Sequence, residues 1–236
     1  MTELPQIQES LKKLEERLGV TFRDKTHLLV AITHRSYLNE HREATQDHNE
    51  RYEFLGDAVL ELVVTDFLFR KYPEKPEGEL TAVRAALVNT VSIADASTKL
   101  ELNEFLLLSK GEERDTGRAR QYILANTFEA IVGALYLDQG YDAAQSFIAQ
   151  ELFNRTERIV EKRLWQDAKS RFQELAQEHV SVTPSYETLS QTGPDHDRVF
   201  TVGAFLGNEK IAEGKGRSKQ EAEQAAAEKA IEAKDW

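Results

Sequence analysis

Hydrophobic periodicity changes once along this 236-residue chain, close to Asp167. From Leu4 to about Gln166, apolar residues recur at intervals of three and four, which predicts amphipathic helices. The helical segments include LLVAITHRSYL, FLGDAVLELVVTDFLF, LTAVRAALVNTVSIADASTKL and YILANTFEAIVGALYL. After Asp167 the pattern becomes that of a short helix, several strands and a final helix. The change predicts two domains, at residues 1–160 and 168–236, with a linker at 161–167.

The second part of the chain is predicted to be a small α+β domain with the element order α-β-β-β-α. AKSRFQELAQEH has the spacing of an amphipathic helix, and SYETLSQTG, HDRVFTVGAFLG and EKIAEGKG alternate as strands do. An alanine-rich helix closes the chain, with Ser218 as its N-cap and Glu221 completing a capping box. The predicted fold class is therefore an all-α domain followed by an α+β domain.

Composition limits the partners and the compartment. The net charge is −11, and residues 169–236 hold 9 Lys and Arg against 12 Asp and Glu, so binding of a polyanion requires a local basic face. No apolar run approaches the roughly 20 residues that span a bilayer, and the N-terminus lacks the apolar core of a signal peptide. Zero Cys excludes disulfides and thiolate metal sites and fits the reducing cytoplasm, where we expect this protein.

Acidic residues interrupt the apolar segment HNERYEFLGDAVLELVV at residues 48–64. On a helix, Glu50, Glu53 and Asp57 lie within an arc of about 60°, where like charges repel one another. One interpretation is a solvated helix face. The apolar flanks argue against it, because they leave little of the helix to face water. Gly56, in mid-helix, costs about 1 kcal/mol relative to Ala and indicates close approach of another backbone.

A second helical segment, QYILANTFEAIVGALYLD, supplies a matching face. Asn126 and Glu129 share it, and Ala130 and Gly133 continue it with small side chains that allow close packing. Clustered oxygen ligands without His or Cys suit a hard cation such as Mg²⁺. A buried structural network is an equally good interpretation of this spacing. Di-iron carboxylate bundles are disfavoured, because no Glu is followed by His at the third position.

These stretches resemble a known family. HNERYEFLGDAVLELVV is similar to the signature of ribonuclease III, and so are AITHRSY (31–37), EGELTAVRAALVN (77–89) and LSKGEERDTGRARQYILANTFEAIVGALYLDQGY (108–141). KSRFQELAQ, GPDH and GKGRSKQEAEQAAAEKA resemble the double-stranded RNA-binding domain of bacterial members. The resemblance implies a homodimeric Mg²⁺-dependent endoribonuclease, with Mn²⁺ as a substitute cation. It would process ribosomal and other structured precursor RNA, leaving 5′-phosphate and 3′-hydroxyl ends.

The resemblance also assigns roles within the acidic segments. It implies that the metal ligands are Glu53, Asp57, Asn126 and Glu129 and that the catalytic residues are Asp57, Glu129 and Glu50, the last an outer acid. It implies that the ring of Phe54 inserts into the partner subunit, although ordinary core packing is the simpler interpretation of one Phe on an apolar helix. We read His34 and Arg35 as structural polar residues and assign them no catalytic role.

One ligand position departs from the family pattern. Where the family usually has Asp before Thr-Phe-Glu-Ala, this chain has Asn126, a neutral and weaker ligand for Mg²⁺. Asn126 is either a natural variant with an adjusted site or an inactivating substitution that leaves a protein binding double-stranded RNA without efficient cleavage. We favour a natural variant that still cleaves, because the three acids are intact.

The small domain is expected to read the shape of A-form RNA. By resemblance, one minor groove would be contacted from the first helix, the next minor groove from the loop between strands, and the intervening phosphates from the start of the last helix. The residues are, in that order, Ser170, Gln173 and Glu174; His196; and Lys215, Arg217, Ser218 and Lys219. The family often has a second basic residue where this chain has Gln220, so we expect weaker but still salt-sensitive binding.

Overall fold

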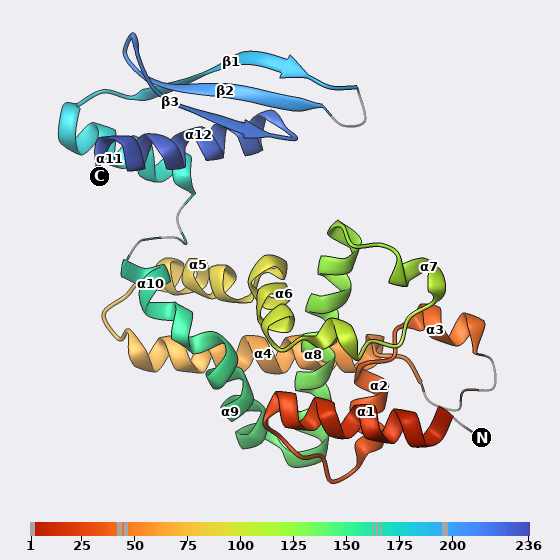
Figure 1. Cartoon of the computed structure of the whole chain (residues 1–236). Helices are drawn as coiled ribbons and strands as arrows, with labels where there is room; N and C mark the ends of the chain where they lie inside the picture. The colour runs from red at the N-terminus through yellow and green to blue at the C-terminus, as the bar shows by residue number, and fades with distance from the viewer. Residues whose placement is uncertain are drawn as a thin grey trace. The chain divides into compact units, whose positions relative to one another are not determined.

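The computed structural model describes residues 3–41, 44, 47–161, 163, 165, 167–194 and 198–236. The chain divides into two compact units, Met1–Val160 and Glu161–Trp236 (Figure 1). Across the described ranges, no helix is both long and apolar enough to cross a bilayer.

The first unit is helical, as the periodicity predicts. Its α-helices are α1 (Glu3–Leu18), α2 (Lys25–Ala31), α3 (Arg35–Glu40), α4 (Glu50–Lys71), α5 (Glu77–Val88), α6 (Thr90–Lys99), α7 (Lys110–Glu113), α8 (Arg118–Gln139), α9 (Tyr141–Leu152) and α10 (Thr156–Glu161). Two 3₁₀ segments, η1 (Leu102–Glu104) and η2 (Phe153–Arg155), connect some of them. The two longest helices, α4 and α8, contribute Leu60, Val63, Phe128 and Ile131 to the buried core.

Two segments with continuous helical spacing are interrupted in the structure. Asn89 ends α5 and begins α6, because its backbone is extended and its side chain accepts a hydrogen bond from the Ser92 N–H at 2.9 Å. Residues 32–34 separate α2 from α3, because Thr33 pairs with Leu107 in an isolated β-bridge. Both interruptions satisfy backbone groups that a continuous helix would satisfy internally.

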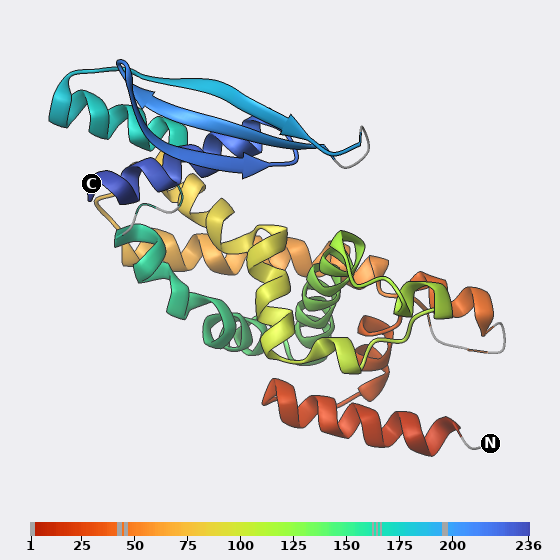
Figure 2. The ribbon, with the colours of Figure 1, turned by 45° about the horizontal axis from the view of Figure 1, so that its top comes forward.

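The second unit has the predicted order α-β-β-β-α. Its elements are α11 (Ala168–Val180), β1 (Pro184–Thr192), β2 (Val199–Leu206), β3 (Glu209–Gly216) and α12 (Lys219–Lys234). The strands form an antiparallel sheet in the order β1-β2-β3, and both helices pack against one of its faces (Figure 2). Phe172 of α11 and the alanines of α12 fill the space between helices and sheet.

The start of α12 confirms the predicted N-cap. The Ser218 side chain accepts a hydrogen bond from the Glu221 N–H at 3.1 Å. The return bond differs slightly from a standard capping box, because the Glu221 carboxylate accepts from the Arg217 N–H at 2.8 Å and not from that of Ser218.

Candidate active site

Helices α4 and α8 cross with their backbones in direct contact. A Cβ atom on Gly56 would lie 1.7 Å from the carbonyl oxygen of Glu129, and one on Gly133 would lie 2.3 Å from the carbonyl oxygen of Tyr52. Only glycine fits at either position. The close approach predicted from Gly56 is therefore confirmed, and the glycine-containing face of α8 is its partner.

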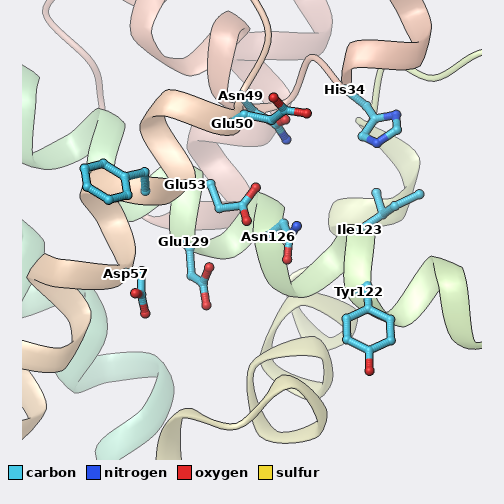
Figure 3. A pocket seen from close by; sticks show the side chains of 10 residues that line it. His34, Asn49, Glu50, Glu53, Asp57, Tyr122, Ile123, Asn126 and Glu129 are labelled. Atoms are coloured by element: carbon cyan, nitrogen blue, oxygen red, sulfur yellow. The ribbon is translucent and has the colours of Figure 1, made fainter.

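The crossing brings four oxygen-bearing side chains to one pocket of about 540 Å³. Glu53 and Asp57 come from α4, and Asn126 and Glu129 come from α8 (Figure 3). Glu50, at the first position of α4, lines the same pocket. All five acidic and amide residues that the sequence singles out in these two segments therefore share one pocket.

The carboxylates in this pocket perturb one another. Burial raises the pKa of Glu129 to about 8, and the negative charges of Asp57, Glu53 and Glu61 add to the rise. The pKa of Glu53 is also raised, first by burial and then by Glu50, while a side-chain hydrogen bond with Asn126 acts in the opposite direction. A strongly raised carboxyl pKa in a pocket is typical of functional sites.

The carboxylate and amide oxygens of this pocket are of the kinds that bind hard cations. Among the described residues, no three Asp, Glu or His side chains lie close enough together to hold a metal ion as they stand. Four carboxylates and the Asn126 amide nevertheless line a single pocket, and a bound cation would offset the burial and the mutual repulsion that raise the pKa of Glu129. The residue types therefore fit Mg²⁺, with side-chain adjustment on binding.

Glu50 lies at a more solvated position than Glu129. Arg35 Nη1 is 3.3 Å from one carboxylate oxygen of Glu50, and His48 Nδ1 is 3.8 Å from the other. The side chain of Glu50 is about half exposed. This environment agrees with an outer acid that has a cationic neighbour, Arg35.

Sequence reasoning missed several pocket residues. His34, Asn49, Tyr122 and Ile123 also line the pocket (Figure 3). Tyr122 lies four residues before Asn126 on α8, so helical spacing could have indicated it. His34 reaches the pocket from a segment distant in sequence, and no local pattern indicates that contact.

In the second unit, the proposed RNA-contacting side chains are exposed on α11 and around the start of α12. Ser170, Gln173 and Glu174 lie on the exposed face of α11, and Lys215, Arg217 and Lys219 are exposed near Ser218. His196 lies outside the described residues. Ser170 and Gln173 line a pocket of about 260 Å³ together with Gln220 and Gln224, so the structure brings the α11 group close to the first turns of α12.

Ion pairs and caps fix the two helices of this unit relative to each other. Lys169 Nζ lies 2.6 Å from the Glu223 carboxylate and over the ring of Tyr186, 4.9 Å from its centroid. Asp167 caps α11 through the Ser170 N–H at 3.0 Å and accepts a hydrogen bond from the Gln224 side chain. The distance between the two groups of candidate RNA contacts is therefore set by several interactions.

Comparison with known proteins agrees with both units. Residues 24–156 match the protein family described as Ribonuclease-III-like, and residues 168–234 match the double-stranded RNA binding motif. The first match alone covers more than half of the chain. This chain belongs to the ribonuclease III family. It is therefore an endoribonuclease of the ribonuclease III type with a double-stranded RNA-binding domain.

Individual relatives support this assignment along almost the whole chain. Ribonuclease 3 from Carboxydothermus hydrogenoformans is 46% identical over 95% of this chain and 95% of its own length. Ribonuclease 3 from Geobacillus kaustophilus is 45% identical over 94% of this chain and 89% of its own. Among solved structures, the ribonuclease III nuclease domain from Campylobacter jejuni is 41% identical, with a TM-score of 0.54, and covers 60% of this chain and 97% of that domain.

The ribonuclease III fold leaves part of α4 uncovered within the chain. Phe54 is 82% exposed, and Leu62 and Phe69 on the same helix are exposed as well. The expectation that little of this helix faces water is therefore wrong, and core packing does not explain Phe54. The Campylobacter jejuni ribonuclease III domain is described as having structural flexibility in a region involved in dimer formation.

Proposed function

We propose that this chain is a Mg²⁺-dependent endoribonuclease that cleaves double-stranded RNA and leaves 5′-phosphate and 3′-hydroxyl ends. Mn²⁺ would substitute for Mg²⁺, and the substrates would be ribosomal and other structured precursor RNA. The observation that carries the proposal is the shared pocket of Glu53, Asp57, Asn126 and Glu129 at the crossing of α4 and α8, in a chain of the ribonuclease III family.

These four side chains would hold the cation. When bound, such a cation lowers the pKa of an attacking water and polarises the scissile phosphate. Glu129 is the buried ligand, and with a pKa of about 8 it would release a proton on binding near neutral pH. Asp57 and Glu129 would act with Glu50, which lines the same pocket and has Arg35 as a neighbour.

The second domain would hold the duplex. Ser170, Gln173 and Glu174 would contact one minor groove, and His196 would contact the next. The phosphates between them would meet Lys215, Arg217, Ser218 and Lys219, where the amino end of α12 also favours anions. All described members of this set except the partly buried Ser218 are exposed, which supports the assignment.

We assign the nuclease domain to residues 1–160, the linker to 161–167 and the RNA-binding domain to 168–236. The division into compact units ending at Val160 and beginning at Glu161 supports the end of the nuclease domain at residue 160. We further propose a homodimer, supported by the exposure of Phe54. A cytoplasmic location is proposed from the absence of Cys in the sequence.

A second candidate function is binding of double-stranded RNA without efficient cleavage. Asn126 favours this function for two reasons. An amide is a weaker cation ligand than a carboxylate, and the Asn126 side chain already forms a hydrogen bond with Glu53. Both functions predict RNA affinity, so only metal-dependent cleavage separates them.

The test compares this chain with Asn126→Asp on one duplex RNA, over a range of Mg²⁺ and Mn²⁺ concentrations. We expect both proteins to cleave and the Asp variant to reach its maximal rate at lower Mg²⁺. A chain that is inactive in both metals, and becomes active as Asn126→Asp, would establish the second function. Equal metal dependence would show that Asn126 does not impair cation binding.

A further inference from the structure

His34 is held rigidly at the edge of the catalytic pocket. It is the N-cap of α3, and its backbone N–H donates to the Leu107 carbonyl at 3.0 Å. Its side chain lines the pocket that Asn126 and Glu129 also line (Figure 3). A side chain fixed in this way is already positioned to contact a molecule that binds in the pocket.

The hydrogen bonds of His34 determine which ring nitrogen carries the proton. Nδ1 accepts from the Ser36 N–H at 3.3 Å and lies 2.8 Å from the Ser36 hydroxyl oxygen. That hydroxyl oxygen accepts from the Ser109 N–H at 3.0 Å, which leaves its own proton to donate to Nδ1. Nδ1 is therefore an acceptor, and the proton of the neutral ring is on Nε2.

The surroundings agree with a neutral ring. Burial lowers the pKa of His34, and the nearby Arg35 and His48 lower it too, against Glu112 and Glu50, which raise it. A neutral imidazole with its proton on Nε2 is a hydrogen-bond donor and cannot serve as a metal ligand through that nitrogen.

Among the described side chains that line the pocket, those able to donate a hydrogen bond besides His34 are Asn49, Asn126 and Tyr122. Four of its lining side chains are carboxylates, which accept hydrogen bonds and repel the oxygens of an RNA backbone. Phosphate oxygens and ribose hydroxyls need donors in order to be positioned. His34 supplies one without adding charge.

We propose that His34 contacts the RNA substrate directly, donating its Nε2–H to a backbone oxygen of the strand that enters the catalytic pocket. The oxygen belongs to a phosphate or to a ribose 2′-hydroxyl. The proposal rests on the proposed function, because it requires an RNA strand in this pocket. His34 orients that strand, and the carboxylates remain the groups that bind the cation.

Two isosteric substitutions separate this contact from the helix cap. In His34→Asn, Oδ1 replaces Nδ1 as the acceptor for the Ser36 N–H, but no atom occupies the place of Nε2. In His34→Gln, Nε2 of the amide replaces the donor, and the capping acceptor is lost. Asn is a good N-cap residue and Gln is not.

We expect His34→Asn to raise the KM for duplex RNA about fivefold, as for the loss of one neutral hydrogen bond, with an unchanged thermal midpoint. His34→Gln should keep a KM close to that of the unsubstituted chain and melt about 2–4 °C lower. The opposite pattern, or a KM that follows the melting temperature in both variants, would show that His34 is only a cap.

Salt and substrate chemistry complete the test. Because His34 is neutral, His34→Asn should leave the salt dependence of RNA binding unchanged, whereas Lys219→Ala should flatten it. If the effect of His34→Asn disappears on a duplex with 2′-deoxy nucleotides around the cleavage site, the acceptor is the 2′-hydroxyl. If the effect persists, the acceptor is a phosphate oxygen.

Failure of the proposed function is detected separately. RNA binding in Mg²⁺ is measured for Glu129→Gln with and without His34→Asn, because cleavage does not interfere in that background. An unsubstituted chain that never cleaves would contradict the proposed function. If the double variant binds RNA more weakly than Glu129→Gln alone, the contact by His34 is still supported. If the two proteins bind RNA equally well, the contact is contradicted.

Discussion

Glu53 and Asn126 show how the metal-free pocket is stabilised at the level of single residues. The Asn126 side chain forms a hydrogen bond with Glu53 that opposes the effects raising the pKa of this carboxyl. An Asp at the same position would add a further negative charge beside Glu53 and Glu129. Asn126 therefore avoids a further charge in this pocket, and we expect it to bind a cation less strongly than Asp would.

Glu129 should make the stability of the metal-free protein depend on pH. Its pKa is about 8 in the folded chain against an ordinary 4.5, so the folded chain retains a proton that the unfolded chain releases. The resulting stability is fully present below about pH 4.5 and is lost as the pH rises through about 8. We expect the thermal midpoint in a chelator to fall with pH more steeply for the unsubstituted chain than for Glu129→Gln.

The matched measurement uses Mg²⁺. Added Mg²⁺ should reduce the loss of stability of the unsubstituted chain at about pH 8, because a cation replaces the proton. Parallel melting curves for the two proteins in the chelator would contradict the raised pKa of Glu129.

At the scale of elements, the crossing of α4 and α8 creates the site. Gly56→Ala would place a Cβ 1.7 Å from the Glu129 carbonyl oxygen and force the two helices apart. We expect a loss of about 3 kcal/mol or more in the free energy of unfolding, and a loss of cleavage, because the proposed ligands come from both helices. Urea unfolding and a cleavage assay measure both effects.

Gly78→Ala is the matched control. Gly78 lies in the first turn of α5, and a Cβ there would meet no atom within 4 Å. Substitution should raise stability by about 0.5 kcal/mol and leave cleavage unchanged. If Gly56→Ala behaved like Gly78→Ala, the backbone contact between α4 and α8 would not be needed for the site.

Much of this arrangement could be predicted from local patterns. Each of the informative patterns lies within one or two turns of a helix. They are the spacing of Glu50, Glu53 and Asp57, the glycine at position 56, and the face of small side chains that follows Glu129. The breaks at Asn89 and at residues 32–34 could not be predicted in the same way. The apolar spacing continues through Asn89, and the second break depends on the pairing of Thr33 with Leu107, which is distant in sequence.

At the scale of the whole molecule, the exposed apolar face of α4 favours packing against a partner subunit. Phe54 is 82% exposed, so its ring contributes little to the core of its own chain. We expect Phe54→Ala to leave the far-UV spectrum and the melting of the monomer nearly unchanged but to weaken self-association, as measured by sedimentation velocity. The physical reason is the loss of an aromatic anchor from an apolar interface.

Leu189→Ala is the control, because Leu189 is an exposed apolar residue of β1, in the other domain. It should leave self-association unchanged. A Phe54→Ala protein that sediments like the unsubstituted chain would remove the support that Phe54 gives to the homodimer.

Sequence patterns were least informative at this scale. An apolar helix face predicts burial, but the pattern does not show whether the covering atoms belong to the same chain or to another. The net charge of −11 argued against a polyanionic partner, yet the second unit exposes Lys215, Arg217 and Lys219 near the start of α12. Local surface chemistry, and not total charge, decides such binding.

The most direct test is cleavage of a duplex RNA by the full chain in Mg²⁺, alongside Glu129→Gln and Asp66→Asn. Asp66 is a carboxylate on α4 that pairs with Arg70 at 2.9 Å and does not line the pocket. The unsubstituted chain and Asp66→Asn should cleave and leave 5′-phosphate ends, and Glu129→Gln should be slower by about 100-fold or more. Equal rates for all three proteins would contradict a catalytic site at the crossing of α4 and α8.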